Sequence, residues 1–261
     1  MKQAWLLISL LLLAGCSTSY NAATDRTESL VLSTEKEVEL GQAASRQVEK
    51  EFKPVRDPVL LERLDRVGQR IAAVSDRTDL TYRFNIIDMK EDEISVPNAF
   101  ALPGGPIYVS LGLMNLLKAD DELAAVLGHE MGHVVARHAA KRLQGAIGLQ
   151  LLQILAAGTK SARTVDDRVN LDVALASLLT EYSQEDEIQA DRLGVRYLKR
   201  AGYDPTAALR ALNALRDFTF KQPARRYSYF RTHPFFADRL RIVRQEATGQ
   251  INFDDYINSR R

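Results

Sequence analysis

The spacing of apolar and polar residues along the chain predicts a mostly helical protein. Apolar residues recur every three or four positions in several long stretches, and serine, threonine or aspartate precedes most of them, as at the start of a helix. Asp57-Pro58 and Asp204-Pro205 fit the preference of helices for an aspartate cap followed by proline in the first turn. The predicted helices cover about residues 34–52, 58–74, 120–138 and 171–200, with a candidate break at 183, and two more begin near 205 and 234.

Two other stretches have the pattern of strands. Residues 81–87, TYRFNII, alternate between polar and apolar side chains. Residues 98–110, NAFALPGGPIYVS, predict two short extended runs on either side of a Pro-Gly-Gly turn. Helices with one small sheet predict the α+β class. The roughly 230 residues after position 33 are enough for one domain with a sizeable core.

The first residues predict export rather than a membrane span. Lys2 is followed by an apolar run over residues 4–14, which is shorter than the roughly 20 residues that a spanning helix needs. Residues 13–16 read LAGC, which is similar to the lipobox of bacterial lipoproteins, where cleavage precedes a cysteine that is then lipidated. We therefore expect a signal peptide over 1–15 and a lipid anchor on Cys16.

The lipid anchor, together with the residues after it, predicts where the protein is located and how its chain is divided. Ser17 after the cysteine resembles lipoproteins sorted to the outer membrane, so we expect the periplasmic face of that membrane. The segment 16–33 is polar and without periodicity, which suits a flexible tether to a single domain over 34–261. An uncleaved signal with an incidental cysteine is the alternative. Cys16 is the only cysteine, so no intramolecular disulfide can form.

The charge balance argues against a nucleic-acid partner. The full sequence has 35 basic and 34 acidic residues, and loss of Lys2 with the signal peptide makes the two numbers equal. Such a chain has no long-range field that attracts nucleic acid. Residues 148–158, GLQLLQILAAG, are strongly apolar but short. A core helix is the favoured interpretation of that stretch, and contact with the membrane is the alternative.

The stretch HEMGH at residues 129–133 has the arrangement of a catalytic zinc site. His129 and His133 stand about 40° apart around a helix and one turn apart, so both imidazoles can face one Zn²⁺ ion per chain. Glu130 stands about 100° from His129 and can reach a water on that ion as general base and then acid. The alternative is a helix with surface histidines. The apolar sequence around the two histidines, LAAVLGHEMGHVV, argues against this alternative, because an unsatisfied polar pair in such surroundings would be costly.

A third ligand must come from elsewhere in the chain. His138 lies nine residues after His129, about half a turn away on a continuous helix, so we expect it to face away from the metal. The segment 181–194, EYSQEDEIQADRLG, offers several acids, of which Glu187 and Asp191 lie four apart. Glu187 could bind zinc while Asp191 accepts a hydrogen bond from a ligating imidazole. A solvated acidic helix face is the alternative.

Several motifs occur together in one order. HEMGHVVARH, EDEIQAD and RTHPFFADR follow one another, and NAFALPGGPIYVSLGLMNLL precedes them. Over roughly residues 35–247 they resemble metallopeptidase family forty-eight, a group of gluzincins. The resemblance implies a zincin-type domain whose small sheet edges the active-site cleft, and it implies Glu187 as the third zinc ligand. It offers Asp191 as a proton donor, but we prefer an outer hydrogen-bonding role because Glu130 already has the geometry for proton transfer.

The resemblance has further implications for substrate and branch. It implies that an edge strand pairs with an extended substrate backbone, a form of β-augmentation, and this strand contains Asn98, Ala99, Phe100 and Ala101. The sequence lacks the spanning helices and the C-terminal repeat domain of some relatives. We therefore expect the soluble periplasmic lipoprotein branch, and recruitment of partners through such repeats is not expected.

His233 and Arg239 belong to the last motif, RTHPFFADR. The resemblance offers two roles for His233. It can be a fourth ligand that plugs the zinc in a resting state, or it can donate a hydrogen bond to the oxyanion. Arg239 can anchor this loop or a substrate carbonyl. A purely structural helix start at His233-Pro234 is the third interpretation.

Two functional hypotheses follow. The first is a zinc endopeptidase that degrades misfolded or misassembled cell-envelope proteins and meets the outer-membrane assembly machinery. The second is a non-catalytic or chaperone-like lipoprotein with a structural metal site. The presence of Glu130 favours the first, because a structural zinc needs no general base.

Overall fold

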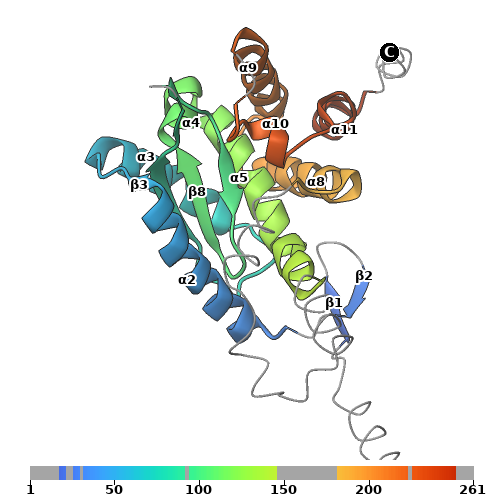
Figure 1. The fold of residues 1–261 in the computed structure, drawn as a ribbon. Coiled ribbons are helices and arrows are strands. Elements are labelled where there is room, and N and C mark those ends of the chain that lie inside the picture. The colour runs from blue at the N-terminus through green and yellow to red at the C-terminus, as the bar shows by residue number, and fades with distance from the viewer. Residues whose placement is uncertain are drawn as a thin grey trace, which may run out of the picture.

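The computed structural model describes residues 18–21, 26–29, 32–91, 94–145, 181–222 and 225–250. Helices predominate and surround one small sheet (Figure 1). The helices are α2 (Thr34–Glu51), α3 (Pro58–Ala72), α4 (Leu111–Leu116), α5 (Asp120–Val135), α8 (Gln184–Ala201), α9 (Ala207–Lys221), α10 (Tyr229–Thr232) and α11 (Phe236–Thr248). The main sheet contains β3 (Lys53–Pro54), β4 (Arg83–Asp88), β7 (Ala99–Ala101) and β8 (Pro106–Ser110). The α+β prediction is confirmed.

The starts of α2, α3 and α5 agree with the predicted positions, while α9 and α11 start about two residues later than predicted. The N-cap of α9 is Thr206 and not the predicted Asp204. Asp57 caps α3, and its carboxylate accepts hydrogen bonds from the backbone N–H groups of Val59 and Leu60. Ser183 and Asp186 form a capping box at the start of α8, so the candidate break at Ser183 is the start of this helix. Helix α5 ends at Val135, three residues before the predicted end. The short helices α4 and α10 were not expected.

The sheet has the order β3-β4-β8-β7, so β7 lies at one edge. Strand β4 runs parallel to β8, while β7 is antiparallel to β8 across the predicted Pro-Gly-Gly turn. Gly104 and Gly105 in that turn have φ values of 74° and 112°, a region that favours glycine. Two smaller pairs involve β5 (Lys90–Glu91) with β6 (Ile94–Ser95) and β1 (Thr18–Asn21) with β2 (Arg26–Ser29).

Each face of the sheet is covered by helices. On one face the side chains of Ile86, Ile107 and Val109 belong to the main core with α3 and α5. On the other face, Phe100 and Tyr108 stack with ring centroids 5.4 Å apart and join a second cluster with apolar residues of α2. Figure 1 shows the sheet between α2 and α5. Alternation along the strands therefore assigns each side chain to one of two cores.

Helices α5 and α8 lie side by side because small residues meet at their contact (Figure 1). A Cβ atom built on Gly132 would lie 2.7 Å from the carbonyl oxygen of Ala190. A Cβ atom on Gly194 would lie 2.9 Å from the backbone nitrogen of His129. Distances this short leave no room for a methyl group without movement of one helix. The backbones of the HEMGH and EDEIQAD segments are thereby held close together.

Several predictions concern residues outside the described ranges. The signal peptide over 1–15, Cys16 and the apolar stretch 148–158 are among them, and they stay predictions. Strands β1 and β2 lie within the segment 16–33, for which the tether also stays a prediction. Within the described parts of the chain, no helix has both the length and the hydropathy needed to cross a membrane.

Replacing Gly132 with alanine tests the close contact between α5 and α8. We expect Gly132→Ala to lower the free energy of unfolding by about 1–3 kcal/mol relative to Gly145→Ala, because its methyl group meets backbone only 2.7 Å away. Gly145→Ala is the matched control, since a Cβ there meets nothing within 4 Å. Urea unfolding measures both variants. Equal midpoints and slopes for the two would show that the helices do not depend on this contact.

Candidate metal centre

Helix α5 carries three candidate residues in the interior of the protein. His129, Glu130 and His133 are 4%, 0% and 1% exposed. The Nε2 atoms of His129 and His133 lie 3.1 Å apart, because residues four positions apart occupy the same helical face one turn apart. Burial lowers the pKa of His133 well below its ordinary value, so its ring is neutral, as a metal ligand must be.

Helix α8 adds a carboxylate to the two imidazoles. Glu187 is fully buried, and its Oε2 lies 3.5 Å from Nε2 of His129. Its Oε1 lies 3.3 Å from Nε2 of His133. Burial opposes ionisation of this carboxyl, but the positive charge of Arg239 and the contact with His233 hold its pKa well below the ordinary value. The group is therefore an anion at neutral pH.

His233 completes a cluster of four possible ligands. It follows α10, and its backbone N–H donates to the carbonyl of Tyr229 over 2.8 Å. Its Nδ1 lies 3.0 Å from Oε1 of Glu187 and 3.4 Å from Nε2 of His129. One ligand atom from each of His129, His133, Glu187 and His233 lies within 4.8 Å of the others.

These separations fit a single divalent ion. Bonds of about 2.0–2.1 Å at tetrahedral angles put neighbouring ligand atoms about 3.3 Å apart. Five contacts between these side chains, counting both oxygens of Glu187, are 3.0 to 3.5 Å long, and no pair in a set of one ligand atom per residue is more than 4.8 Å apart. Nδ1 of His129 lies 2.8 Å from Asp191 Oδ1, which can only accept when ionised, so Nε2 offers a lone pair to the cluster. The residues present therefore suit a metal such as zinc.

Glu130 lies beside this cluster with unused hydrogen-bonding capacity. Neither of its carboxylate oxygens accepts a hydrogen bond from any described residue, although both are buried. Oε1 lies 3.5 Å from Nε2 of His233. Burial of a carboxylate without hydrogen bonds costs free energy, which a purely structural role would not explain. The position of Glu130 therefore points to interaction with a polar species at the cluster.

Arg239 joins α11 to the carboxylates of α8. This buried guanidinium contacts both oxygens of Asp191 over 2.8 and 2.9 Å, and Nη1 lies 2.9 Å from Oε2 of Glu187. Nη1 also donates to the carbonyl of His233 over 3.3 Å. Burial raises the pKa of Asp191, but the charge of Arg239 and the hydrogen bonds from Arg239 and His129 outweigh burial and hold it below the ordinary value. Arg239 therefore ties His233 to the α8 carboxylates.

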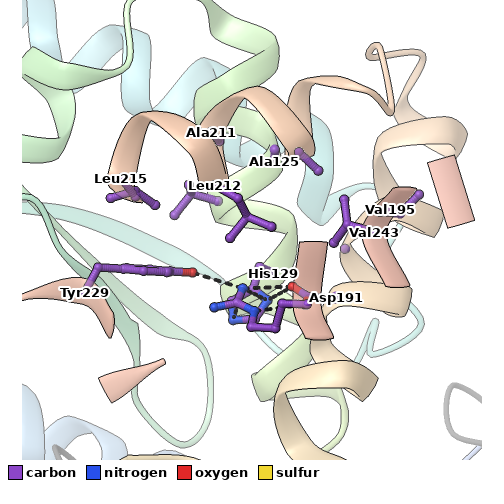
Figure 2. Close-up of a pocket in the computed structure, with 13 residues that line it drawn as sticks. Ala125, His129, Asp191, Val195, Ala211, Leu212, Leu215, Tyr229 and Val243 are labelled. Atoms are coloured by element: carbon purple, nitrogen blue, oxygen red, sulfur yellow. Dashed lines mark hydrogen bonds and ion pairs between the residues drawn. The ribbon is translucent and has the colours of Figure 1, made fainter. Parts of the chain in front are cut away.

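An apolar wall shields the outer side of this network. Figure 2 shows His129 and Asp191 facing each other, with the hydroxyl of Tyr229 directed toward them. Apolar side chains from α5, α8, α9 and α11 line a cavity of about 20 Å³ next to the pair, among them Val195 and Leu212. The cavity holds about one water molecule at most, so the His129–Asp191 hydrogen bond is shielded from bulk solvent.

The candidate substrate strand lies next to the cluster. Asn98 is 1% exposed, and residues 99–101 form β7 at the edge of the sheet. His233 Nε2 lies 3.3 Å from the carbonyl oxygen of Ala99, and the amide of Asn98 donates to the carbonyl of Tyr227 over 2.9 Å. The segment 225–233 therefore lies against this edge and covers it in the described conformation.

The expected orientation of His138 is wrong. His138 is 3% exposed and does not face away from the site, because its Nδ1 lies 2.8 Å from Nδ1 of His133. The expectation assumed one continuous helix, whereas α5 ends at Val135 and Arg137 has a left-handed φ of 58°. The helix is thus interrupted at this point, and the turn at Arg137 directs His138 toward His133.

Two tyrosines of the site were not identified from the sequence. The ring of Tyr182 stacks on His133 at 3.9 Å between centroids, and that of Tyr229 stacks on His233 at 4.6 Å. Tyr229 stands four residues before His233, a spacing that could have suggested the contact. Tyr182 lies before α8, where no periodicity marks it.

Comparisons with known proteins extend this picture. Residues 59–247 match the model of peptidase family M48. The chain is 32% identical over 182 residues to "Mitochondrial metalloendopeptidase OMA1" of Schizosaccharomyces pombe, covering 70% of this chain and 51% of that protein. It is 28% identical over 227 residues to "Beta-barrel assembly-enhancing protease" of Escherichia coli, covering 83% and 45%.

A third relative matches the chain over a shorter stretch. "Metalloprotease LoiP" of Escherichia coli is 33% identical over 155 residues, which cover 58% of this chain and 59% of LoiP. The chain thus spans about half the length of the curated relatives that it matches. All three names describe proteases.

Proposed function

Because the chain belongs to peptidase family M48, as its motifs predict, we propose that it is a zinc-dependent endopeptidase. The observation that carries the proposal is the convergence of His129, His133 and Glu187 beside the carboxylate of Glu130. Two imidazoles and one carboxylate are the protein ligands of catalytic zinc in a group of peptidases, with a remaining position for water or substrate.

Each residue of the site has a proposed task. A bound zinc ion supplies Lewis-acid chemistry by polarising the substrate carbonyl and lowering the pKa of a water molecule to about 7. Glu130 accepts the proton of the attacking water and returns it to the leaving amine. Asp191 accepts a hydrogen bond from Nδ1 of His129 and fixes the orientation of that ring. Because Asp191 is already paired with His129 and Arg239, whereas neither oxygen of Glu130 accepts a hydrogen bond from a described residue, we assign proton transfer to Glu130 rather than to Asp191.

Arg239 and His233 have supporting tasks in this proposal. Arg239 holds Asp191, Glu187 and the segment of His233 in place through buried ion pairs and one hydrogen bond. His233 is the fourth ligand of a resting state, a role supported by its complete burial and by the 3.0 Å contact with Glu187. It leaves when an extended substrate backbone pairs with residues 98–101 along β7.

The proposed substrates are misfolded or misassembled proteins of the cell envelope. The name of the Escherichia coli relative, a β-barrel assembly-enhancing protease, supports this class and a partner in outer-membrane assembly. The LAGC motif supports lipid attachment at Cys16 and a place at the periplasmic face of the outer membrane. Once the segment 225–233 moves away, the edge strand suits unfolded chains, because it binds backbone rather than a particular side chain.

One observation favours a second candidate function. Four buried protein donors, with His233 among them, form the closed set that is typical of structural zinc. If His233 never leaves, the protein is a non-catalytic or chaperone-like lipoprotein in which the metal is a strut. The two functions differ in the need for Glu130.

Replacing Glu130 tests the hydrolytic mechanism. We expect Glu130→Gln to retain its zinc and to lose cleavage of casein by a factor of about 100 or more, because an amide cannot accept the proton of water. Glu39→Gln is the control, since Glu39 is an exposed residue of α2 that contacts Lys36 only through a surface ion pair. Zinc content and casein cleavage are measured on the same preparations. Equal cleavage by Glu130→Gln and the wild type would leave the structural-metal function.

Replacing His233 tests its role as a resting ligand. We expect His233→Ala to cleave casein faster than the wild type, because the fourth position opens without displacement of the imidazole. An oxyanion donor would give the opposite result, a loss of about 100-fold or more in kcat. Arg231→Ala serves as control, since Arg231 is an exposed residue of the same segment. Initial rates at saturating casein distinguish these outcomes.

A further inference from the structure

We propose that His138 is a positioning residue for the metal site: it accepts a hydrogen bond from His133 and fixes the tautomer in which Nε2 of His133 faces the metal. The inference rests on the proposed function, because it assigns a partner to one of the proposed zinc ligands. His138 is not among the four side chains whose ligand atoms converge. Its contribution would come through His133.

The hydrogen-bond partners of His138 determine which of its nitrogens carries the proton. Nε2 lies 2.7 Å from Oε1 of Gln189 and 3.3 Å from Oδ1 of Asp186. Both oxygens only accept, so Nε2 carries hydrogen and Nδ1 keeps a lone pair. Nδ1 of His138 lies 2.8 Å from Nδ1 of His133, which must then be the donor. His133 consequently directs the lone pair of Nε2 at the cluster.

The two proposed histidine ligands therefore have different outer partners. His129 donates to the carboxylate of Asp191, and that carboxylate is neutralised by Arg239. His133 donates to a neutral imidazole. A second carboxylate at this point would add charge to an interior that already holds those of Glu130 and Glu187. An imidazole gives the same orientation without that electrostatic cost.

The backbone is shaped to bring His138 to this position. On a continuous helix a residue five positions after His133 would lie about 140° away around the axis. The helix instead ends, and Arg137 takes a φ of 58°, which is uncommon for a residue with a side chain. Nη2 of Arg137 lies 2.9 Å from Oε2 of the buried Glu37 and donates to the carbonyl of Leu32. These contacts hold the turn that directs His138 at His133.

The ring of His133 is also fixed from its face. Tyr182 stacks on it with an interplanar angle of 23°, and the guanidinium of Arg142 lies over the other side of Tyr182 at 3.9 Å. Stacking restricts the plane of the ring but does not choose between its two tautomers. The hydrogen bond to His138 makes that choice.

Two isosteric variants test the inference by zinc affinity. His138→Leu removes the acceptor, whereas His138→Asn places an amide oxygen near the position of Nδ1. We expect His138→Leu to weaken zinc binding by about 10–100-fold, measured by competition with a chromogenic chelator, and His138→Asn to recover most of that loss. Urea unfolding of the metal-free proteins shows whether the two variants fold equally well.

The outcomes separate this inference from the proposed function. Wild-type affinity in His138→Leu, or equal losses in both variants, would overturn the role of the hydrogen bond. A wild-type protein that binds no zinc would overturn the proposed function itself.

A measurement on the unaltered protein covers the case in which His138→Leu fails to fold. Long-range ¹H–¹⁵N spectra of the zinc-loaded wild-type chain report the protonated nitrogen of each of its four histidines. We expect hydrogen on Nδ1 of His133 and on Nε2 of His138. Hydrogen on Nδ1 of His138 would overturn the inference, because that nitrogen could not accept from His133.

Discussion

Buried lone pairs and negative charges converge on one point between α5 and α8. The rest of the structure depends on how the repulsion between these groups is offset. His129, His133, Glu187 and His233 present ligand atoms within 4.8 Å of one another in the interior, and several of their contacts are 3.0–3.5 Å long. Electron-rich atoms at such distances repel unless a proton or a metal cation lies between them. A divalent ion resolves the conflict and converts four unfavourable neighbours into one coordination shell.

Formal charges around this point support the same conclusion. The buried carboxylates of Glu130, Glu187 and Asp191 face a single buried guanidinium, that of Arg239, among the described residues at the cluster. A divalent cation would bring the sum to zero. Close packing of α5 against α8 at Gly132 and Gly194 keeps the carboxylates within reach of the imidazoles. The glycines and the charges therefore both contribute to assembling the metal site.

Local signals explain how much of this could be predicted from the sequence. The HEMGH spacing depends only on nearby residues, so α5 was predicted close to its observed bounds. For the second helix of the site the sequence predicted a stretch over 171–200 with a candidate break at Ser183, and α8 starts after that residue. The family and the α+β class were also predicted and are confirmed. That Glu187 faces the histidines was suggested by motif resemblance, since spacing alone cannot place two distant helices together.

Features that depend on distant contacts were missed. Neither glycine nor proline directly follows α5, and the left-handed conformation of Arg137 is held by Glu37, about 100 positions earlier in the chain. The position of His138 next to His133 could therefore not be predicted from the periodicity of a continuous helix. Tyr182 was missed for a similar reason, because its contact with His133 is made across the α5–α8 interface.

The metal affinity of Glu187→Gln tests the central claim most directly. The control is Glu185→Gln, an exposed position on the same helix. Zinc content after dialysis and the dissociation constant from chelator competition are measured for both variants and the wild type. The account predicts that Glu185→Gln binds zinc like the wild type, while Glu187→Gln loses affinity by about two orders of magnitude or more, at least the effect of removing an outer partner of a ligand. A folded Glu187→Gln protein that holds zinc as tightly as the wild type would contradict it.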